Sequence, residues 1–332
     1  MPSLNTTYLT LPLSSPLLAS ASPMTGKLDA LRQLEDAGAA AVVLPSVFEE
    51  QLHQEKAFMD HFLDANTESH AEARDFFPDA TLYTRQTDHA LEHLTQAKAT
   101  LGIPVIASLN GSTREGWGHF AKQIEDAGAD AIELNLYEIS ADPNISSAEI
   151  ETRQLETVSG ITQNLSIPVA VKIGSHYAAM ANMAKRFEEA GAAALVMFNR
   201  FYQPDFDITS RTASRKLGLS SSREMLLPMS WIAILRGQRS LDLAATTGVH
   251  EITDIIKYLM AGANVVCSTS ALLKHGPAKM TEFKTGLTHW LEENGYNTAD
   301  ELRGCMRREF VDNPELFERA NYIKLLSSYP SS

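Results

Sequence analysis

Cysteine is nearly absent from this chain, which has only Cys267 and Cys305 among its 332 residues. Two thiols cannot build a disulfide framework, and they cannot supply the four cysteine ligands of an iron–sulfur cluster or of a structural zinc site within the chain. A reducing, cytoplasmic location is therefore expected.

Long apolar runs and clusters of positive charge are missing as well. No run reaches the ~18 apolar residues of a membrane span, and residues 1–10 lack the basic and apolar regions of a signal peptide. Acidic residues outnumber basic ones by 41 to 28, which gives a formal charge of −13. We therefore expect neither nucleic acid nor a membrane as a partner.

One phrase of residues is repeated along the chain. A helix-like stretch ends in Ala-Gly-Ala and runs into a short apolar stretch at 35–44, 125–134 and 188–198, with a shorter copy at 261–267. Glycine just past a helix can adopt the left-handed conformation that ends it, and a short apolar run fits a strand buried on both faces of a parallel sheet. The repeat therefore predicts an α/β protein, whose chemistry lies at the carboxyl ends of its strands.

The number of helix–strand units indicates the architecture. Eight strands are expected, at 16–20, 41–44, 104–108, 131–136, 168–173, 194–198, 241–246 and 264–268. Eight units favour a closed (β/α)8 TIM barrel over an open doubly wound sheet, and no Gly-x-Gly-x-x-Gly turn follows the first strand. We expect the barrel at 1–295 and a charged helical tail at 296–332.

A polar stretch at about 49–87 interrupts the pattern. It is too long for a plain connection, so we expect it to carry helix and to form a lid over one end of the barrel. Its histidines, His53, His61 and His70, do not have the spacing of a zinc motif, and no metal site is expected.

Two polar residues close apolar strands and are the first site candidates. Lys172 ends an apolar Val-Ala-Val run, and a lysine there is hard to bury without a partner anion. Its role is either to face an anionic ligand or to form a salt bridge with a carboxylate on a neighbouring strand. Asn135 lies inside an apolar strand, where it either binds a ligand or is a hydrogen-bonded core amide.

The last two strands predict an anion site. Gly248 follows the seventh strand, and Ser268 and Thr269 end the eighth strand before a new helix. Backbone N–H groups at such helix starts bind phosphate in many barrels, although the two hydroxyls could instead cap the helix. One lysine, several amides and a phosphate site together suit a heterocycle with a phosphate tail, such as flavin mononucleotide (FMN).

These segments resemble those of the dihydroorotate dehydrogenase family, and most of all a divergent branch of it. The resemblance runs over about 5–290 and is carried by Ser-Pro-Leu-Leu-Ala-Ser at 15–20, Val-Ile-Ala-Ser at 105–108, Glu-Leu-Asn at 133–135, Pro-Val-Ala-Val-Lys at 168–172, Thr-Gly-Val at 247–249 and Ser-Thr-Ser-Ala-Leu at 268–272. It implies a flavoprotein oxidoreductase of pyrimidine biosynthesis that forms a homodimer.

The resemblance also implies roles for individual residues. Asn135 and Lys172 would contact the isoalloxazine ring, with the lysine at its N1–O2 edge. The remaining FMN-binding residues would be Ala19, Ser20, Ser46, Ser108, Gly248, Ser268 and Thr269. The substrate would be held by Asn110, Asn144 and Asn199.

The sequence departs from the family on the substrate side. Leu44-Pro45-Ser46 stands where the family has Thr-Lys-Ser, and no Gly-Leu-Pro-Asn loop is found between 48 and 90. The family's Ser-Cys/Ser-Pro-Asn segment, which leads to its catalytic base, is replaced by residues 136–144. Glu138 or Ser140 could be the base there, with Lys172 as the third catalytic residue, or the chain could lack a base of the family's kind.

We therefore predict an FMN-dependent dehydrogenase acting on CH–CH bonds, with hydride transfer between flavin N5 and dihydroorotate or a related planar substrate. The altered loops suggest that dihydroorotate itself is not oxidised. Any iron–sulfur electron relay would have to lie in a separate partner chain, because this chain lacks cluster-forming cysteines. Two alternatives stay open: a redox-inactive lyase or isomerase with a phosphate ligand that uses Lys172 as a Schiff base, and a non-catalytic partner of a redox complex.

Overall fold

The computed structural model describes residues 1–48, 86–111, 117–136, 138–200, 204–214, 218–317, 322, 326 and 327. The predicted insert at 49–87, with its three histidines, lies outside these residues except for Gln86 and Thr87. Those two residues begin a helix.

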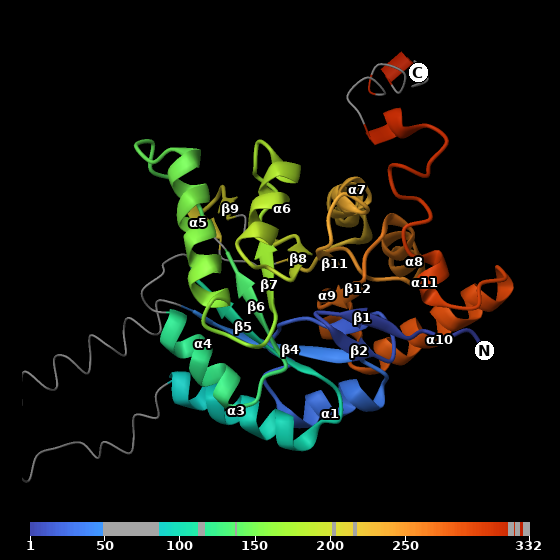
Figure 1. Cartoon of the computed structure of the whole chain (residues 1–332), viewed down its shortest axis with the longest axis horizontal. Helices are drawn as coiled ribbons and strands as arrows, with labels where there is room; N and C mark the ends of the chain where they lie inside the picture. Colours follow the sequence, from blue (N-terminus) through green and yellow to red (C-terminus); the bar gives the residue numbers. More distant parts are fainter. Residues whose placement is uncertain are drawn as a thin grey trace, which may run out of the picture.

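Eight parallel strands of the described chain close into a barrel (Figure 1). β12 pairs with β3 and β8 pairs with β11, which closes the ring. The predicted (β/α)8 barrel is confirmed. The strands are β3 (Leu17–Ala19), β4 (Ala41–Phe48), β5 (Val105–Asn110), β6 (Ala131–Asn135), β7 (Val169–Ile173), β8 (Ala194–Met197), β11 (Asp242–Ala245) and β12 (Val265–Ser268).

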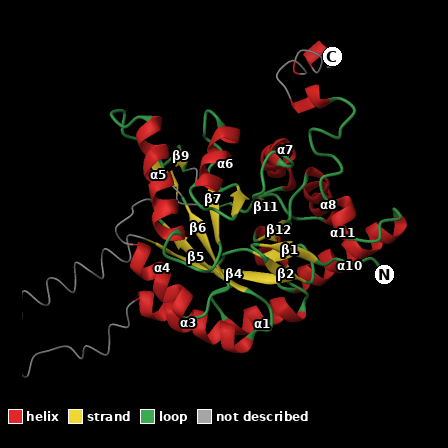
Figure 2. Ribbon diagram, viewed as in Figure 1, coloured by secondary structure: helices red, strands yellow, loops and turns green. Residues whose placement is uncertain are grey.

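Helices surround the barrel, and Figure 2 shows them in red around the yellow strands. The α-helices up to β12 are α1 (Leu28–Asp36), α3 (Gln86–Thr100), α4 (Trp117–Asp126), α5 (Ser147–Thr162), α6 (Met180–Glu189), α7 (Leu226–Leu235) and α8 (Ile252–Ala261). Those after it are α9 (Ser270–His275), α10 (Ala278–Glu293) and α11 (Ala299–Leu302), and short 3-10 helices lie at η2 (Ser222–Met225) and η3 (Pro314–Phe317). In the described part of the predicted helical tail, residues 303–312 form turns and bends.

Three copies of the repeated phrase end their helices with the same backbone conformation. Gly38, Gly128 and Gly191 have φ angles of 99°, 93° and 98°. The alanine that follows each glycine donates its N–H to the carbonyl five residues earlier, as Ala129 does to Ile124. This is the helix-ending motif in which glycine carries the left-handed conformation. The sequence prediction is confirmed at all three positions.

The first residue of each repeat, Glu35, Glu125 or Glu188, makes a structural hydrogen bond that the sequence analysis did not predict. Its carboxylate accepts a backbone N–H from the loop before a later strand, so it ties one helix–strand unit to the next. The donors are Gly102 for Glu35 (2.8 Å), Ser166 for Glu125 (2.7 Å) and Ser240 for Glu188 (3.1 Å). The repeated phrase therefore joins units as well as ending helices.

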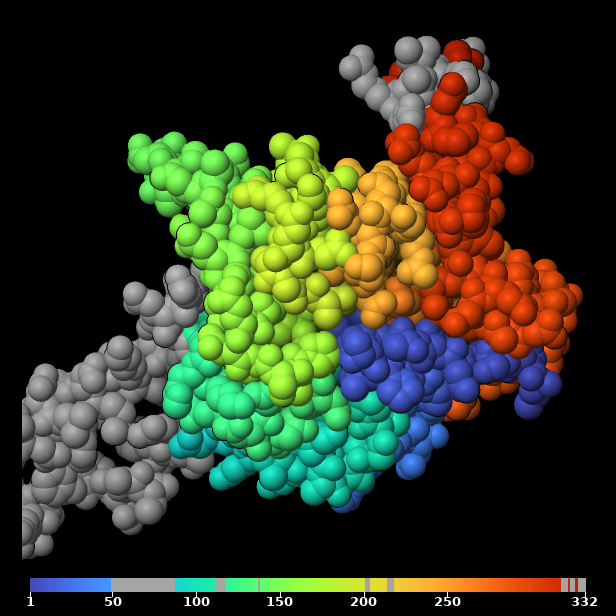
Figure 3. Space-filling view, in the orientation of Figure 1, coloured from blue at the N-terminus to red at the C-terminus, as the bar shows by residue number. Residues whose placement is uncertain are grey.

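An N-terminal hairpin of β1 (Thr6–Tyr8) and β2 (Leu11–Leu13) closes the amino-terminal end of the barrel. Tyr8 and Leu9 are buried among side chains of the barrel interior, including Leu18 and Cys267. The Leu9 N–H donates to the Asp242 carboxylate (2.8 Å). Figure 3 shows these blue residues covering the face between the green and orange parts of the barrel. The sequence analysis did not predict this hairpin.

A second hairpin, β9 (Asp205–Asp207) with β10 (Thr212–Ser214), follows the sixth barrel strand. It lies within the long connection that the sequence left without predicted strands. None of the helices in the described residues is long and apolar enough to cross a membrane.

Candidate active site

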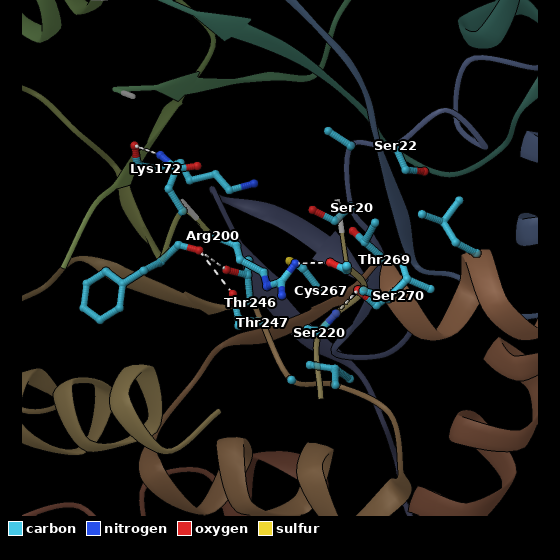
Figure 4. A pocket seen from close by; sticks show the side chains of 18 of the residues that line it. Ser20, Ser22, Lys172, Arg200, Ser220, Thr246, Thr247, Cys267, Thr269 and Ser270 are labelled. Atoms are coloured by element: carbon cyan, nitrogen blue, oxygen red, sulfur yellow. Dashed lines mark hydrogen bonds between the residues drawn. The ribbon is translucent and has the colours of Figure 1, made fainter. Parts of the chain in front are cut away.

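A cavity of about 320 Å³ lies at the carboxyl ends of the barrel strands. Its walls come from strand ends far apart in the sequence: Ser20 follows β3, Lys172 is the second-last residue of β7, Asn199 follows β8, Thr246 follows β11 and Thr269 follows β12. Figure 4 shows Lys172, Ser20, Thr246 and Thr269 around it. This is the position at which barrels of this class carry their chemistry, and the volume suits a small ligand.

Lys172 sits at the inner edge of the cavity with a buried carboxylate beside it. Its Nζ lies 3.2 Å from Oε1 of Glu133, and the two side chains are 13% and 3% exposed. β6 and β7 are neighbours in the barrel, with Asn135 beside Lys172 in the register. The salt bridge that the sequence left open as an alternative is therefore present, and Lys172 still lines the cavity.

Amide groups next to Lys172 bond to one another. Asn199 donates its side-chain N–H to the Asn135 side-chain oxygen and, more weakly, to the Lys172 carbonyl (3.4 Å). Asn110 is the register partner of Asn135 in β5. Three asparagines that the sequence placed at three strand ends therefore follow one another around one side of the barrel mouth.

The turn after β11 forms the opposite wall. Thr247 and Gly248 both have positive φ angles, 74° and 73°, and both line the cavity. A Cβ on Gly248 would lie 2.6 Å from the Met225 nitrogen, so only glycine allows the turn to pack this closely. The Thr246 hydroxyl donates to the Phe198 carbonyl (2.7 Å), which fixes the start of the turn (Figure 4).

The two hydroxyls after the eighth strand behave differently. Thr269 lines the cavity and is the N-cap residue of α9, but its side chain makes no capping bond. Ser268 does not line the cavity, because its hydroxyl points to the Val249 carbonyl (3.3 Å) in the barrel wall. Of the predicted pair, only Thr269 presents its side chain to a ligand.

Arg200 and Ser220 also reach this cavity, although the sequence analysis assigned them no role. The Arg200 guanidinium binds Glu224 (2.7 Å) and the Gly218 carbonyl. The Ser220 hydroxyl bonds His250 Nε2 (3.0 Å), and the Ser220 N–H donates to Ser270 (3.1 Å). Arg200 was visible in sequence as the residue after Asn199 at a strand end; Ser220 lies in a loop with no strand signal.

Two neutral groups lie in the barrel interior near the charged pair. Burial, reinforced by the Glu133 charge, raises the pKa of the Cys267 thiol to about 12. Burial likewise raises the pKa of Tyr8 well above its ordinary value, with contributions from Cys267 and Glu133. Both side chains therefore stay protonated at neutral pH.

Comparison with known proteins decides the family. The family model described as dihydroorotate dehydrogenase matches residues 82–291, which is more than half of the chain. The chain belongs to the dihydroorotate dehydrogenase family. It is therefore a dihydroorotate dehydrogenase-like oxidoreductase.

Curated relatives agree at modest identity. The provisionally named dihydroorotate dehydrogenase A (fumarate) of Aeropyrum pernix is 27% identical over 227 residues, which covers 66% of this chain and 72% of the relative. The catalytic subunit of dihydroorotate dehydrogenase B (NAD(+)) of Methanothermobacter thermautotrophicus is 26% identical over 209 residues, or 61% and 68% of the two chains. The corresponding subunit of Thermoplasma volcanium is 25% identical over 213 residues, or 60% and 67%.

Several predicted residues of this dihydroorotate dehydrogenase family member lie outside the cavity. Glu138 and Ser140 line a separate hollow between α5 and the loop after β7, and Glu138 forms an ion pair with Arg153. Asn144 is exposed and bonds Asp142 (2.9 Å). The structure therefore does not bring the three residues of this loop to Lys172, and their catalytic and substrate roles stay predictions.

Five predicted flavin contacts are also absent from the cavity wall: Ala19, Ser46, Ser108, Asn135 and Ser268. Ala19 is fully buried in the core. Ser46 and Ser108 are register partners in β4 and β5, and their hydroxyls bond each other (2.7 Å). Ser20, Asn199, Gly248, Thr269 and Lys172 are the predicted residues that line the cavity.

Proposed function

We propose that this chain binds FMN in the cavity at the carboxyl ends of its strands and transfers hydride between the flavin and a small planar substrate. One observation carries the proposal. One cavity is lined by Lys172, by the Asn199 amide that Asn135 holds from behind, and by a glycine-dependent turn, which are the groups that a heterocycle with a phosphate tail requires.

The residues present suit FMN chemically. Lys172 and Arg200 supply positive charge, and Thr269 and Ser270 supply hydroxyl donors at the start of α9. Phe198, Val249 and Leu273 give the wall apolar surface for a flat ring. Gly248 lets the turn that lines the cavity pack closely against Met225, with which a side chain there would collide.

The proposed roles follow from this placement. The Thr247–Gly248 turn and Thr269 would hold the phosphate, as backbone and hydroxyl donors do in other barrels. Asn199, fixed by Asn135, would orient the ring. Lys172 would stabilise negative charge at the ring edge. When bound, FMN supplies hydride chemistry at its N5 atom.

The ion pair argues against the Schiff-base alternative. A lysine that forms a Schiff base must lose its proton, and enzymes achieve this by desolvation or by placing another cation nearby. Glu133 is no such cation: it is a carboxylate that lies 3.2 Å from Lys172 Nζ and occupies the amine. The geometry therefore supports a role for Lys172 in electrostatic stabilisation of a ligand rather than in covalent catalysis.

The substrate, the homodimer and the separate electron-accepting partner stay predictions. The expectation that dihydroorotate itself is not oxidised rests on the replaced Thr-Lys-Ser and Ser-Cys/Ser-Pro-Asn segments.

An absorption spectrum of the purified protein tests the proposal. We expect flavin bands near those of free FMN, and release of FMN on denaturation. A colourless protein that also fails to take up added FMN would contradict the proposal. Covalent trapping of Lys172 by borohydride in the presence of a carbonyl compound would then support the Schiff-base alternative.

Anaerobic mixing with dihydroorotate separates the flavin step from the substrate. We expect bleaching of bound flavin by dithionite but little or none by dihydroorotate. Rapid bleaching by dihydroorotate would show that the rebuilt loops still accept the family's substrate.

A further inference from the structure

Glu133 is a buried carboxylate with one charged partner in this region. It projects into the barrel from β6, two residues before Asn135, and it is 3% exposed. Its hydrogen bond to Lys172 (3.2 Å) joins two adjacent strands. A carboxylate is very costly to bury alone, so this pair is formed at the same time as the barrel mouth.

The neighbouring side chains of Cys267 and Tyr8 carry no charge, so the charged group beside Glu133 is the Lys172 amine. Cys267 and Tyr8 are neutral, as their raised pKa values show. The side chain of Lys172 is 13% exposed and lines the cavity, whereas Glu133 lies below it and does not line the cavity. Glu133 therefore binds the lysine from the barrel interior, while the lysine side chain lines the cavity.

We infer that Glu133 is a positioning residue that keeps the Lys172 side chain directed into the cavity, and that it also lowers the positive potential a ligand meets there. This inference rests on the proposed function for its effect on flavin, but its effect on Lys172 does not depend on flavin. Glu133 itself touches neither ligand nor reacting atoms.

The inference predicts opposite effects of the two partners on a bound flavin. Glu133→Gln removes a negative charge beneath the ring site, so the reduction potential of bound FMN should rise. Lys172→Met removes the positive charge, so the potential should fall. A residue with a merely structural role would not shift the potential in opposite directions.

The first test uses the protein freed of any flavin. Acetic anhydride labels only uncharged amines, and peptide mass spectrometry can follow Lys172 by itself. In Glu133→Gln we expect Lys172 to be acetylated about tenfold faster or more at pH 8, because its amine is no longer held by a hydrogen bond to a buried carboxylate. Glu133→Asp, which keeps the charge, should restore most of the protection.

A matched control is available on the surface. Lys185 and Glu189 form an ion pair of 3.6 Å with side chains 46% and 60% exposed. Glu189→Gln should change Lys185 acetylation less than about twofold, since exposed pairs interact weakly. Equal rates for Lys172 in the wild type and in Glu133→Gln would overturn the inference.

A double-mutant cycle keeps the test decisive if one variant folds poorly. Lys172→Met leaves Glu133 buried without a partner, so adding Glu133→Gln should recover part of the lost stability in urea denaturation. Purely additive losses would contradict the inference. If the wild type fails to bind FMN, the proposed function fails, while the labelling result and the cycle still decide the role of Glu133.

Discussion

At the scale of single residues, the cavity wall depends on backbone conformations that few side chains tolerate. Thr247 and Gly248 are consecutive and both left-handed. The turn lies against Met225 at the junction of η2 and α7. The turn therefore couples the shape of the candidate phosphate site to the packing of a neighbouring loop.

Gly248→Ala should destabilise the protein by about 2 kcal/mol or more, from the left-handed strain and the collision with the Met225 backbone. Gly295→Ala is the matched control, because Gly295 ends α10 with a similar φ of 76° and has nothing within 4 Å of its added Cβ. That control should cost about 1 kcal/mol. Urea denaturation measures both variants. Equal costs would mean that the approach to Met225 does not matter.

At the scale of elements, the barrel units are tied together by carboxylates at the helix ends. Glu125, at the end of α4, accepts the N–H groups of Ser166 (2.7 Å) and Ile167 (3.2 Å) before β7. These bonds and the ion pair with Lys122 lower the pKa of Glu125 from 4.5 to about 2. Stability from a lowered pKa is present above about pH 4.5 and is lost as the pH falls toward 2.

Glu125→Gln should therefore cost about 1 kcal/mol at pH 7, and the difference from the wild type should shrink between pH 4.5 and pH 2. Urea denaturation at pH 7, 5, 4 and 3 measures the trend. Asp126→Asn is the control, since Asp126 is 65% exposed and pairs with Lys122 only, and it should change stability little at any pH. A pH-independent loss in Glu125→Gln would contradict the role assigned to its charge.

At the scale of the whole molecule, the hairpin closes one end of the barrel and the ligand cavity occupies the other. Tyr8 packs into the barrel interior from the hairpin. The Lys172–Glu133 pair lies between this interior and the cavity. A ligand in the cavity joins the ends of five strands that belong to separate units. Binding should therefore stabilise the whole barrel rather than one loop.

FMN at about one hundred times its dissociation constant should stabilise the protein by about 2.7 kcal/mol. For a chain of this size we expect the Tm to rise by about 5 °C. Riboflavin at the same concentration is the control, because it has the ring without the phosphate and should raise the Tm less. Equal shifts for the two compounds would argue that the Gly248 turn holds no phosphate.

The sequence predicted the barrel well because its evidence is local and repeated. Each Ala-Gly-Ala phrase has the left-handed glycine that ends a helix, and each apolar run became a buried strand. The N-terminal hairpin was missed because its strands are three residues long and pair only with each other. A hairpin this short leaves little periodic signal.

The site was predicted in part. Lys172, Asn199, Gly248 and Thr269 could be found because each follows or ends an apolar strand, and strand ends meet at one face of a barrel. Glu138 and Ser140 were chosen from their order after β6, but the loop carries them to a separate hollow beside Arg153. Sequence order cannot tell which way a loop turns once it leaves its strand.

The sequence by itself determined the alternation of helix and strand, the helix ends and the strand ends at which polar residues stand, because these depend on neighbours within a few residues. Only the tertiary structure decided that Glu133 pairs with Lys172, that Ser268 turns into the wall, and that Arg200 and Ser220 reach the cavity. Those outcomes depend on strand register and on loops that meet from distant parts of the chain. Burial then stabilises the Glu133–Lys172 pair, because a charged group away from water is costly unless an opposite charge lies beside it.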